Sequence, residues 1–277
     1  MTYLNGIVLG IVQGLAEFLP ISSSGHLTIL QHFFGIEGDS VLLFTILMHV
    51  GTLAAVFIVY WSDIWALIKE LFLTIWDLVR LKGLKLDERP IRKLGVMIIV
   101  ASIPTAIIGV CFKDVFSSFY KSTLPTAIGL IITGFLLWIA ERPRKEGVGI
   151  EKMTFASAII IGTMQGFAIT PGVSRSGSTL FGGLMTGLKR EFAVEFAFLI
   201  SIPSVLGSLI FEGGGGNLDT VVSNSLGPII AGFICSLISG VIAIKVMIKI
   251  VSKYSLRYFS IYVWVVGAAL IGYNIFN

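Results

Sequence analysis

The chain has 277 residues, of which 55% are hydrophobic and only 13% are charged, and its formal net charge is +4. This composition excludes an ordinary soluble domain, because such domains carry about twice that fraction of charged residues. The long apolar runs predict an all-α polytopic membrane protein. The first dozen residues contain no Lys or Arg, so we expect no cleaved signal peptide. The two isolated cysteines predict neither a disulfide nor a metal site.

The first apolar stretch, residues 3–34, is interrupted in its middle by Pro, Ser and Gly. The interruption falls within the sequence QGLAEFLPISSSGH, residues 13–26. A broken helix exposes backbone groups that lipid cannot satisfy. It is therefore tolerated at membrane depth only where it is buried in protein or lines a wet cavity. We expect a re-entrant helix-loop-helix hairpin that enters and leaves the membrane on one side.

Later stretches have the length and hydropathy of six transmembrane helices, at residues 41–60, 91–112, 123–141, 190–211, 226–249 and 258–276. The segment 62–82 combines several charges with tryptophans, which favours an interfacial helix on the cytoplasmic side. The stretch 154–187 is broken like the first, and it predicts a second re-entrant hairpin. Residues 212–225, with four consecutive glycines, are expected to form a mobile outer loop.

The distribution of Lys and Arg predicts the orientation of these elements. Given the six spans, nearly all of these residues fall on one side, which the positive-inside rule makes cytoplasmic. Only Lys113 and Lys121 fall on the other side, and Arg175 is left inside the membrane. Both termini are then outside. The first hairpin enters from the outer face and the second from the cytoplasm, so their tips can meet near the midplane.

The two broken stretches are copies of each other, separated by 152 residues. Residues 10–25 and 162–177 are identical at seven of sixteen positions, where unrelated segments would match at about one or two. We therefore predict one membrane domain, 1–277, made of two repeats with inverted topology, a plan found in many transporter folds. Repeat one covers about residues 1–141 and repeat two about residues 154–277.

The two copies differ where chemistry would require it. Glu17 aligns with Ile169, Ser23 with Arg175, and His26 with Ser178. One copy therefore carries an acid, a serine and an imidazole, and the other carries a guanidinium.

The first hairpin offers several groups for catalysis or binding. Gln13 and Glu17 lie four residues apart, so they share one helix face, and a carboxylate within a membrane marks a functional site by default. His26 can act as a base, an acid or a phosphoryl acceptor, unless its role is only structural. The serine-rich turn can cap a helix and also bind phosphate through its N–H groups. Its residues are Ser22, Ser23, Ser24 and Gly25.

Arg175 is the most informative residue of the second hairpin. Its planar fork of donors suits a phosphate or a carboxylate, and the alternative is an ion pair with Glu17. His49 is either a neighbour of the site or a structural histidine. No nucleotide-binding or metal-binding motif is present, and no nucleic-acid partner is expected. The polar groups beside Arg175 are Ser174, Ser176, Gly177, Ser178 and Thr179.

The motifs FLPISSSGH and PGVSRSGST, each in its own half of the chain, resemble those of the undecaprenyl pyrophosphate phosphatase family, which is associated with bacitracin resistance. The resemblance covers essentially the whole chain. It implies a multi-pass enzyme of the bacterial inner membrane that removes one phosphate from a polyprenyl pyrophosphate lipid. The product, undecaprenyl phosphate, carries peptidoglycan precursors. A divalent cation, Mg²⁺ or Ca²⁺, is also implied.

The resemblance assigns roles to individual residues. Gln13 and Glu17 match the acidic pair that holds the cation, although Gln13 is an amide where many members have a carboxylate. Ser23 matches the serine suggested as nucleophile, His26 the essential histidine, and Arg175 the arginine of the second motif. The remaining serines and glycines of the two turns, with Thr179, are expected to contact the phosphates.

Several alternatives stay open at this point. The attacking group is Ser23, His26 or water. An inverted repeat with broken helices also fits a transporter or flippase of the lipid phosphate, and a structural subunit is a weaker alternative. A homo-oligomer is left open. We expect the site to open to the outer face, and we expect Phe167, Ile169 and Val173 to close the route from the cytoplasm.

Overall fold

The structure is a computed structural model that describes residues 2–36, 39–120, 122–141, 147–212 and 218–276. Within these residues there is no strand beyond one isolated bridge between Val148 and Leu188, so the all-α class is confirmed. The first half of the chain contains helices α1 (Tyr3–Phe18), α2 (Ser23–Phe33), α3 (Asp39–Val59), α4 (Trp61–Val79), α5 (Pro90–Cys111), α6 (Lys113–Phe119) and α7 (Thr123–Ala140). The second half contains η1 (Ile150–Lys152), α8 (Phe155–Phe167), α9 (Arg175–Met185), α10 (Arg190–Leu199), α11 (Ser201–Glu212), α12 (Leu218–Lys253) and α13 (Arg257–Phe276).

The described helices include five spans long and apolar enough to cross a membrane. The predicted span 41–60 corresponds to α3, which passes this test only together with α4, from which it is bent by 84°. The predicted span 190–211 is confirmed as one apolar span, Arg190–Ile210, although it consists of two helices that meet at Ile200. The main hydrophobic core gathers around α10, where Phe196, Leu199 and Ile200 are almost fully buried.

The predicted loop at 212–225 is too long. Residues 213–217, which include the glycine run, lie outside the described residues, so the predicted mobility of the loop is not tested. From Leu218 onwards the chain is already helical. The reason is visible in the sequence, because Leu218, Val221, Val222 and Leu226 follow helical spacing without an intervening proline.

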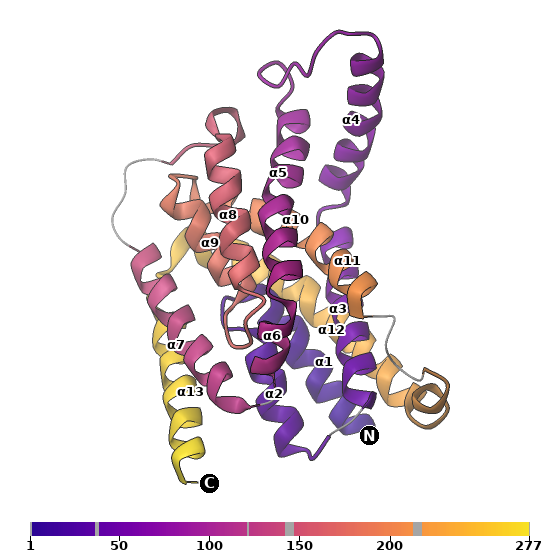
Figure 1. Cartoon of the computed structure of the whole chain (residues 1–277), viewed down its shortest axis with the longest axis vertical. Helices are drawn as coiled ribbons and strands as arrows, with labels where there is room; N and C mark the ends of the chain where they lie inside the picture. The colour runs from indigo at the N-terminus through magenta and orange to yellow at the C-terminus, as the bar shows by residue number, and fades with distance from the viewer. Residues whose placement is uncertain (1, 37–38, 121, 142–146, 213–217, 277) are drawn as a thin grey trace.

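Both broken stretches form helical hairpins, and their tips meet in the middle of the molecule (Figure 1). The backbone N–H of Gly172 donates to Ser24 Oγ at 3.3 Å, and Ser176 Oγ donates to the carbonyl of Leu19 at 3.2 Å. These bonds cross between segments about 150 residues apart in sequence. The polar backbone freed by each break is therefore partly satisfied by the other hairpin, as a membrane environment requires.

Each hairpin packs against a helix from the other half of the chain. Helix α1 packs along α12, α8 packs along α5, and α7 pairs with α13. A Cβ atom at Gly10 would lie 2.2 Å from the carbonyl oxygen of Gly232, and one at the equivalent Gly162 would lie 1.9 Å from that of Ala101. Both glycines therefore allow the same close approach of backbones. This reciprocity supports the internal repeat, whereas the direction of each half relative to a membrane stays a prediction.

Helix α7 fixes the tip of the second hairpin. Thr133 Oγ1 donates to the carbonyl of Gly172 at 3.1 Å and accepts from the backbone N–H of Ser174 at 2.9 Å. Gly172 has φ +82°, and a Cβ there would meet the carbonyl oxygen of Thr126 at 2.0 Å, so only glycine fits. The loop that precedes Arg175 is thus held rigidly.

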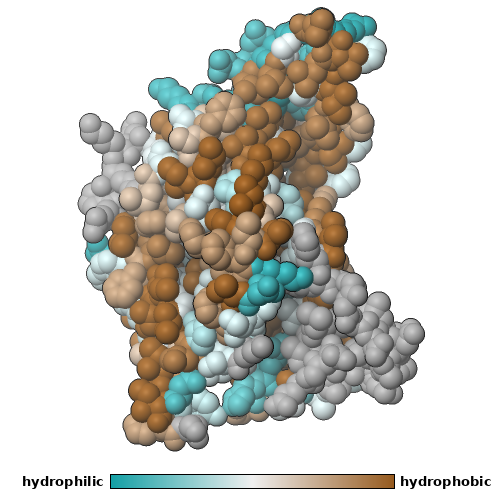
Figure 2. Space-filling view, in the orientation of Figure 1, coloured by the Kyte–Doolittle hydropathy of each residue, from teal (hydrophilic) through white to brown (hydrophobic). Residues whose placement is uncertain are grey.

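Helix α4, in the predicted interfacial segment, is joined to α5 by ion pairs. Arg92 is almost fully buried and donates to Glu70 at 2.7 Å and to Asp77 at 2.9 Å. Figure 2 shows hydrophilic residues gathered at the end of the molecule where these two helices are joined. The helix itself is confirmed, and its place at the membrane surface stays a prediction.

Candidate active site

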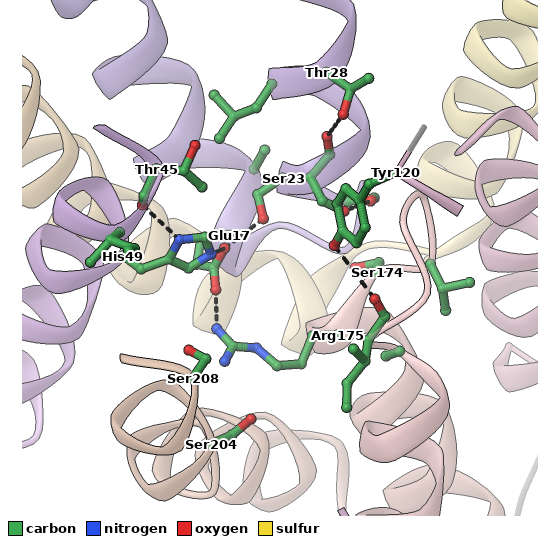
Figure 3. A pocket seen from close by; sticks show the side chains of 18 of the residues that line it. Glu17, Ser23, Thr28, Thr45, His49, Tyr120, Ser174, Arg175, Ser204 and Ser208 are labelled. Atoms are coloured by element: carbon green, nitrogen blue, oxygen red, sulfur yellow. Dashed lines mark hydrogen bonds and ion pairs between the residues drawn. The ribbon is translucent and has the colours of Figure 1, made fainter. Parts of the chain in front are cut away.

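A cavity of about 600 Å³ lies where the two hairpin tips meet (Figure 3). Helices α2, α3, α9 and α11 and the loop before α9 contribute to its walls. Its polar lining includes Glu17, Ser23, His49, Arg175, Ser204 and Ser208. The cavity therefore joins the two motifs that the sequence singled out, and it is far larger than a single ion would need.

Glu17 is at the centre of the hydrogen bonds in this cavity. Its Oε2 atom accepts from Ser23 Oγ at 2.5 Å and from Gln13 Nε2 at 3.0 Å. Its Oε1 atom accepts from Arg175 Nη2, and His49 Nε2 lies 3.8 Å from Oε2. A carboxylate with 4% of its side chain exposed would be costly unless paired and hydrogen-bonded, and this arrangement supplies both.

Ser23 and Glu17 have the geometry that a nucleophile and its base require. Since an ionised carboxylate can only accept, the short bond has the Ser23 hydroxyl as its donor. A weak nucleophile is activated by a base within hydrogen-bond reach. Ser23 is also the first residue of α2, where the helix N-terminus favours negative charge.

Arg175 is the first residue of α9, so two helix N-termini converge on the cavity. Its ion pair with Glu17, an alternative raised by the sequence, is present in the structure. That bond uses one of the five N–H donors of the guanidinium. Figure 3 shows Arg175 reaching across the cavity, with Ser204 and Ser208 of α11 nearby. Binding an anion and pairing with Glu17 are thus compatible roles.

The serine turns divide into cavity-lining and structural residues. Ser22 Oγ accepts from the N–H of Gly25 at 3.3 Å, and Ser174 Oγ accepts from the N–H of Gly177 at 3.1 Å, so both are helix caps. The residues of these turns that line the cavity are Ser22, Ser23, Ser24, Ser174 and Arg175. Those that the structure places outside its lining are Gly25, Ser176, Gly177, Ser178 and Thr179, and Thr179 Oγ1 donates to the carbonyl of Arg175 at 2.9 Å.

The structure places the two histidines on different sides of the cavity wall. His26 is outside the cavity lining, and its ring faces Tyr262 of α13. His49 is inside, beside Glu17, with Nδ1 bonded to the carbonyl of Thr45 at 2.8 Å. Because a carbonyl only accepts, Nδ1 carries a proton, and Nε2 is the ring nitrogen that faces Glu17. Sequence reasoning left His49 undecided because the residues around it read simply as a transmembrane helix.

Gln13 and its repeat partner Gln165 are both buried, and each has an amide oxygen without a hydrogen-bond partner. Gln13 lies beneath Glu17 rather than in the cavity wall, whereas Gln165 lines the cavity. In the part of the chain that the structure describes, no group of three or more His, Cys, Asp or Glu could hold a metal ion.

The fold and the site together define a class of protein. It is a polytopic helical membrane protein in which two broken hairpins join a carboxylate, a serine and an arginine in one polar cavity, an arrangement suited to the anionic part of a lipid. The family model described as bacitracin resistance protein BacA matches residues 6–269, and the chain belongs to this family.

Curated relatives extend along the whole chain. An undecaprenyl-diphosphatase from Alkaliphilus metalliredigens is 49% identical over 99% of this chain and 100% of its own length. One from Carboxydothermus hydrogenoformans is 41% identical over 98% of this chain and 97% of its own. One from Methanosphaera stadtmanae is 41% identical, with 95% of each chain covered.

Proposed function

We propose that this chain is an undecaprenyl-diphosphatase of a bacterial inner membrane. It hydrolyses undecaprenyl pyrophosphate to undecaprenyl phosphate and phosphate, which returns the carrier lipid to cell-wall synthesis and counters bacitracin. The observation that carries this proposal is the position of Glu17, which accepts hydrogen bonds from both Ser23 and Arg175 within one cavity. The names of relatives 41–49% identical over nearly the full chain support it.

Arg175 and the two helix N-termini bind the pyrophosphate. The guanidinium offers its remaining donors to the phosphate oxygens, and the first amides of α2 and α9 favour the same negative charge. Both sets of donors are fixed before the substrate arrives, because the serine caps and Thr133 hold the turns. Fixed donors of this kind stabilise charge that develops in a phosphoryl transfer. The polyprenyl tail stays in the lipid.

Ser23 attacks the terminal phosphorus while Glu17 takes the hydroxyl proton. Undecaprenyl phosphate leaves, and water then hydrolyses the phosphoserine to release phosphate. His49 faces Glu17 and can receive the proton that the carboxylate has taken. The proton route therefore runs along Ser23, Glu17 and His49, in place of the His26 route suggested by the family resemblance.

A divalent cation fits this site only together with its substrate. Glu17 is one carboxylate, and the buried unpaired oxygen of Gln13 is a second protein donor close to it. Mg²⁺ commonly binds with one or two carboxylates and completes its shell with phosphates and water. We propose that Glu17, assisted by Gln13, holds Mg²⁺ or Ca²⁺. Such an ion, when bound, neutralises phosphate charge.

Phosphate release by the purified protein in detergent tests the activity. No gradient exists in a micelle, so a transporter or flippase of the lipid phosphate would release nothing. We expect one phosphate for each undecaprenyl pyrophosphate consumed, measured together with the lipid product. Binding of the lipid without any phosphate release would contradict the proposed hydrolysis and favour the transporter.

We further propose that the cavity opens to the outer face. Its wall includes Ser117 of α6, in the connection predicted to be outside and poor in Lys and Arg. Of the three residues expected to close the route from the cytoplasm, Ile169 and Val173 line the cavity, and the closure itself stays a prediction. Phe167 was wrongly included in that closure, since its side chain is 53% exposed. The cause is that α8 turns its other face to α5.

Labelling of single cysteines tests this orientation in a background lacking Cys111 and Cys235. Ser117→Cys is expected to react with a membrane-impermeant thiol reagent in intact cells, and substrate should protect it. The matched control is Ser252→Cys, at the exposed cytoplasmic end predicted for α12. It should react only in inside-out vesicles. The reverse pattern for the two cysteines would assign the site to a cytoplasmic substrate.

A further inference from the structure

His26 uses both of its ring nitrogens outside the cavity. Nδ1 lies 2.8 Å from the carbonyl oxygen of Ser22, and Nε2 lies 2.8 Å from the hydroxyl of Tyr262. The two rings are nearly parallel, at 8°, with centroids 5.6 Å apart. Because a carbonyl oxygen only accepts, Nδ1 carries the proton, and in the neutral ring Nε2 then accepts from the tyrosine. The contacts therefore fix one tautomer and leave no ring nitrogen for a substrate.

Helical geometry explains why His26 faces away from the cavity. The cavity-lining residues of α2 beyond its first position are Ser24, Leu27, Thr28 and Gln31, which follow the spacing of a single helix stripe. His26 falls between these positions, on the side of α2 that meets α13. A base must come within hydrogen-bond reach of the proton it takes. From this side of the helix, His26 could reach the cavity only if α2 rotated or its contact with Tyr262 were broken.

The carbonyl group that His26 holds belongs to an unusual residue. Ser22 has φ +71°, which is rare for a residue with a side chain, so the surrounding contacts must maintain it. The same carbonyl also accepts from the His26 backbone N–H at 3.3 Å. Ser23, the next residue, directs its hydroxyl to Glu17. The Ser22 carbonyl belongs to the peptide group that joins Ser22 to Ser23. The orientation of this group, which His26 fixes, therefore sets the direction of the Ser23 side chain.

Building on the proposed function, we propose that His26 and Tyr262 form a positioning pair. Their hydrogen bonds fix the orientation of the Ser22 carbonyl, and this orientation in turn fixes the direction of the Ser23 hydroxyl. Neither residue transfers a proton in the reaction. Tyr262 thereby becomes a residue on which turnover depends, although it lies on α13, outside both motifs. Loss of the pair should lower kcat more than it raises KM, because Arg175 and the helix N-termini still bind the substrate.

Variants of the pair separate positioning from proton transfer. In His26→Asn, the amide nitrogen takes the place of Nδ1 and keeps the bond to Ser22, but the residue cannot titrate. We expect kcat to fall by about fivefold or less, the effect of one modest hydrogen bond, with an unchanged pH profile. His26→Ala should lose much more. Tyr262→Phe should also lose about fivefold, and the effects of His26→Asn and Tyr262→Phe should not add.

The chain offers a matched control on the same two helices. His32 of α2 and Tyr273 of α13 make a similar bond of 3.0 Å, about two helical turns further along α2. Tyr273→Phe should keep the wild-type kcat, because no strained turn depends on that bond. If Tyr273→Phe and Tyr262→Phe lost activity equally, the pair would be ordinary packing. If His26→Asn were as inactive as His26→Ala while Tyr262→Phe remained normal, proton transfer by His26 would replace the proposal.

A second readout does not depend on activity, so failure of the pair and failure of the proposed hydrolysis are distinguishable. The chain has three histidines, and the nitrogen-15 NMR signals of His26 are identified by their loss in His26→Asn. We expect the Nδ1-protonated neutral tautomer in the wild type and a changed Nε2 signal in Tyr262→Phe. An Nε2-protonated ring would overturn the proposal even in a fully active enzyme. Conversely, the expected tautomer in a protein that releases no phosphate would refute only the hydrolysis.

Discussion

Replacing Glu17 with Gln is expected to lower kcat by about a thousandfold, within the usual effect of removing a general base. The amide keeps the size of the side chain, so the hairpin tips can still meet. It cannot take the Ser23 proton, and it leaves the Arg175 guanidinium without its negative partner. Phosphate release from undecaprenyl pyrophosphate measures this loss. The dependence of the residual rate on added Mg²⁺ or Ca²⁺ should also weaken.

The matched control for Glu17 is Glu195, another carboxylate in an apolar span. Glu195 lies in α10 and does not line the cavity, so Glu195→Gln should keep most of the activity. Equal losses in the two variants would indicate a general need for membrane carboxylates and not a catalytic role for Glu17. If Glu17→Gln lost its activity but kept the wild-type cation titration, Glu17 would be the base and the cation would bind elsewhere.

The sequence predicted the broken hairpins correctly because lipid leaves few solutions for a helix interrupted by Pro, Gly and Ser. Repetition of the motif also indicated which segments would meet. The bond between Arg175 and Glu17 could be raised as an alternative from charge alone, since each is an isolated charge at membrane depth. These inferences depend on strong energetic penalties, which act in the same way whatever the surrounding packing.

The direction of individual side chains could not be predicted in the same way. His26 and Ser23 are three residues apart, which suggested a shared site, but the turn at Ser22 and the contact with Tyr262 direct the ring elsewhere. Tyr262 is 236 residues away and belongs to no motif, so nothing in the local sequence indicates this pairing. His49 enters the site because α3 packs beside the first hairpin. Such contacts depend on helix rotation, which a hydrophobic pattern sets only loosely.

The break at Ile200 was not predicted, although the sequence contains its cause, because Pro203 has no N–H to donate to the carbonyl of Leu199 and its ring crowds that carbonyl. Residues 190–211 read as one apolar span, and no glycine marks the position where α10 ends. In the structure the amide of Gln165 lies 3.5 Å from the Ile200 carbonyl, and Ser201 Oγ donates to the carbonyl of Phe198 at 2.6 Å. Side chains from the hairpin and from the helix itself therefore satisfy the freed backbone groups. The break places Ser204 and Ser208 of α11 along the cavity.

Replacing Arg175 with Lys is expected to lower kcat/KM for undecaprenyl pyrophosphate by at least about tenfold, a modest loss for a charge-assisted contact. The variant keeps the positive charge, so Glu17 retains a partner and the hairpins remain joined. It loses the planar fork, and a single ammonium cannot hold the carboxylate and two phosphate oxygens in a fixed geometry. Initial rates across lipid concentrations in detergent measure the loss, and inhibition by inorganic pyrophosphate should weaken in parallel.

Arg190 provides the matched control for this substitution. It pairs with Glu141 at 2.8 Å and lies outside the cavity lining, so Arg190→Lys removes a guanidinium from an ion pair that does not meet the substrate. We expect Arg190→Lys to keep kcat/KM within about twofold of the wild type, as a partly exposed ion pair contributes little. Wild-type turnover in Arg175→Lys would restrict Arg175 to joining the hairpins through Glu17. The pyrophosphate would then bind chiefly to the helix N-termini, where the fixed amides of α2 and α9 are the remaining donors.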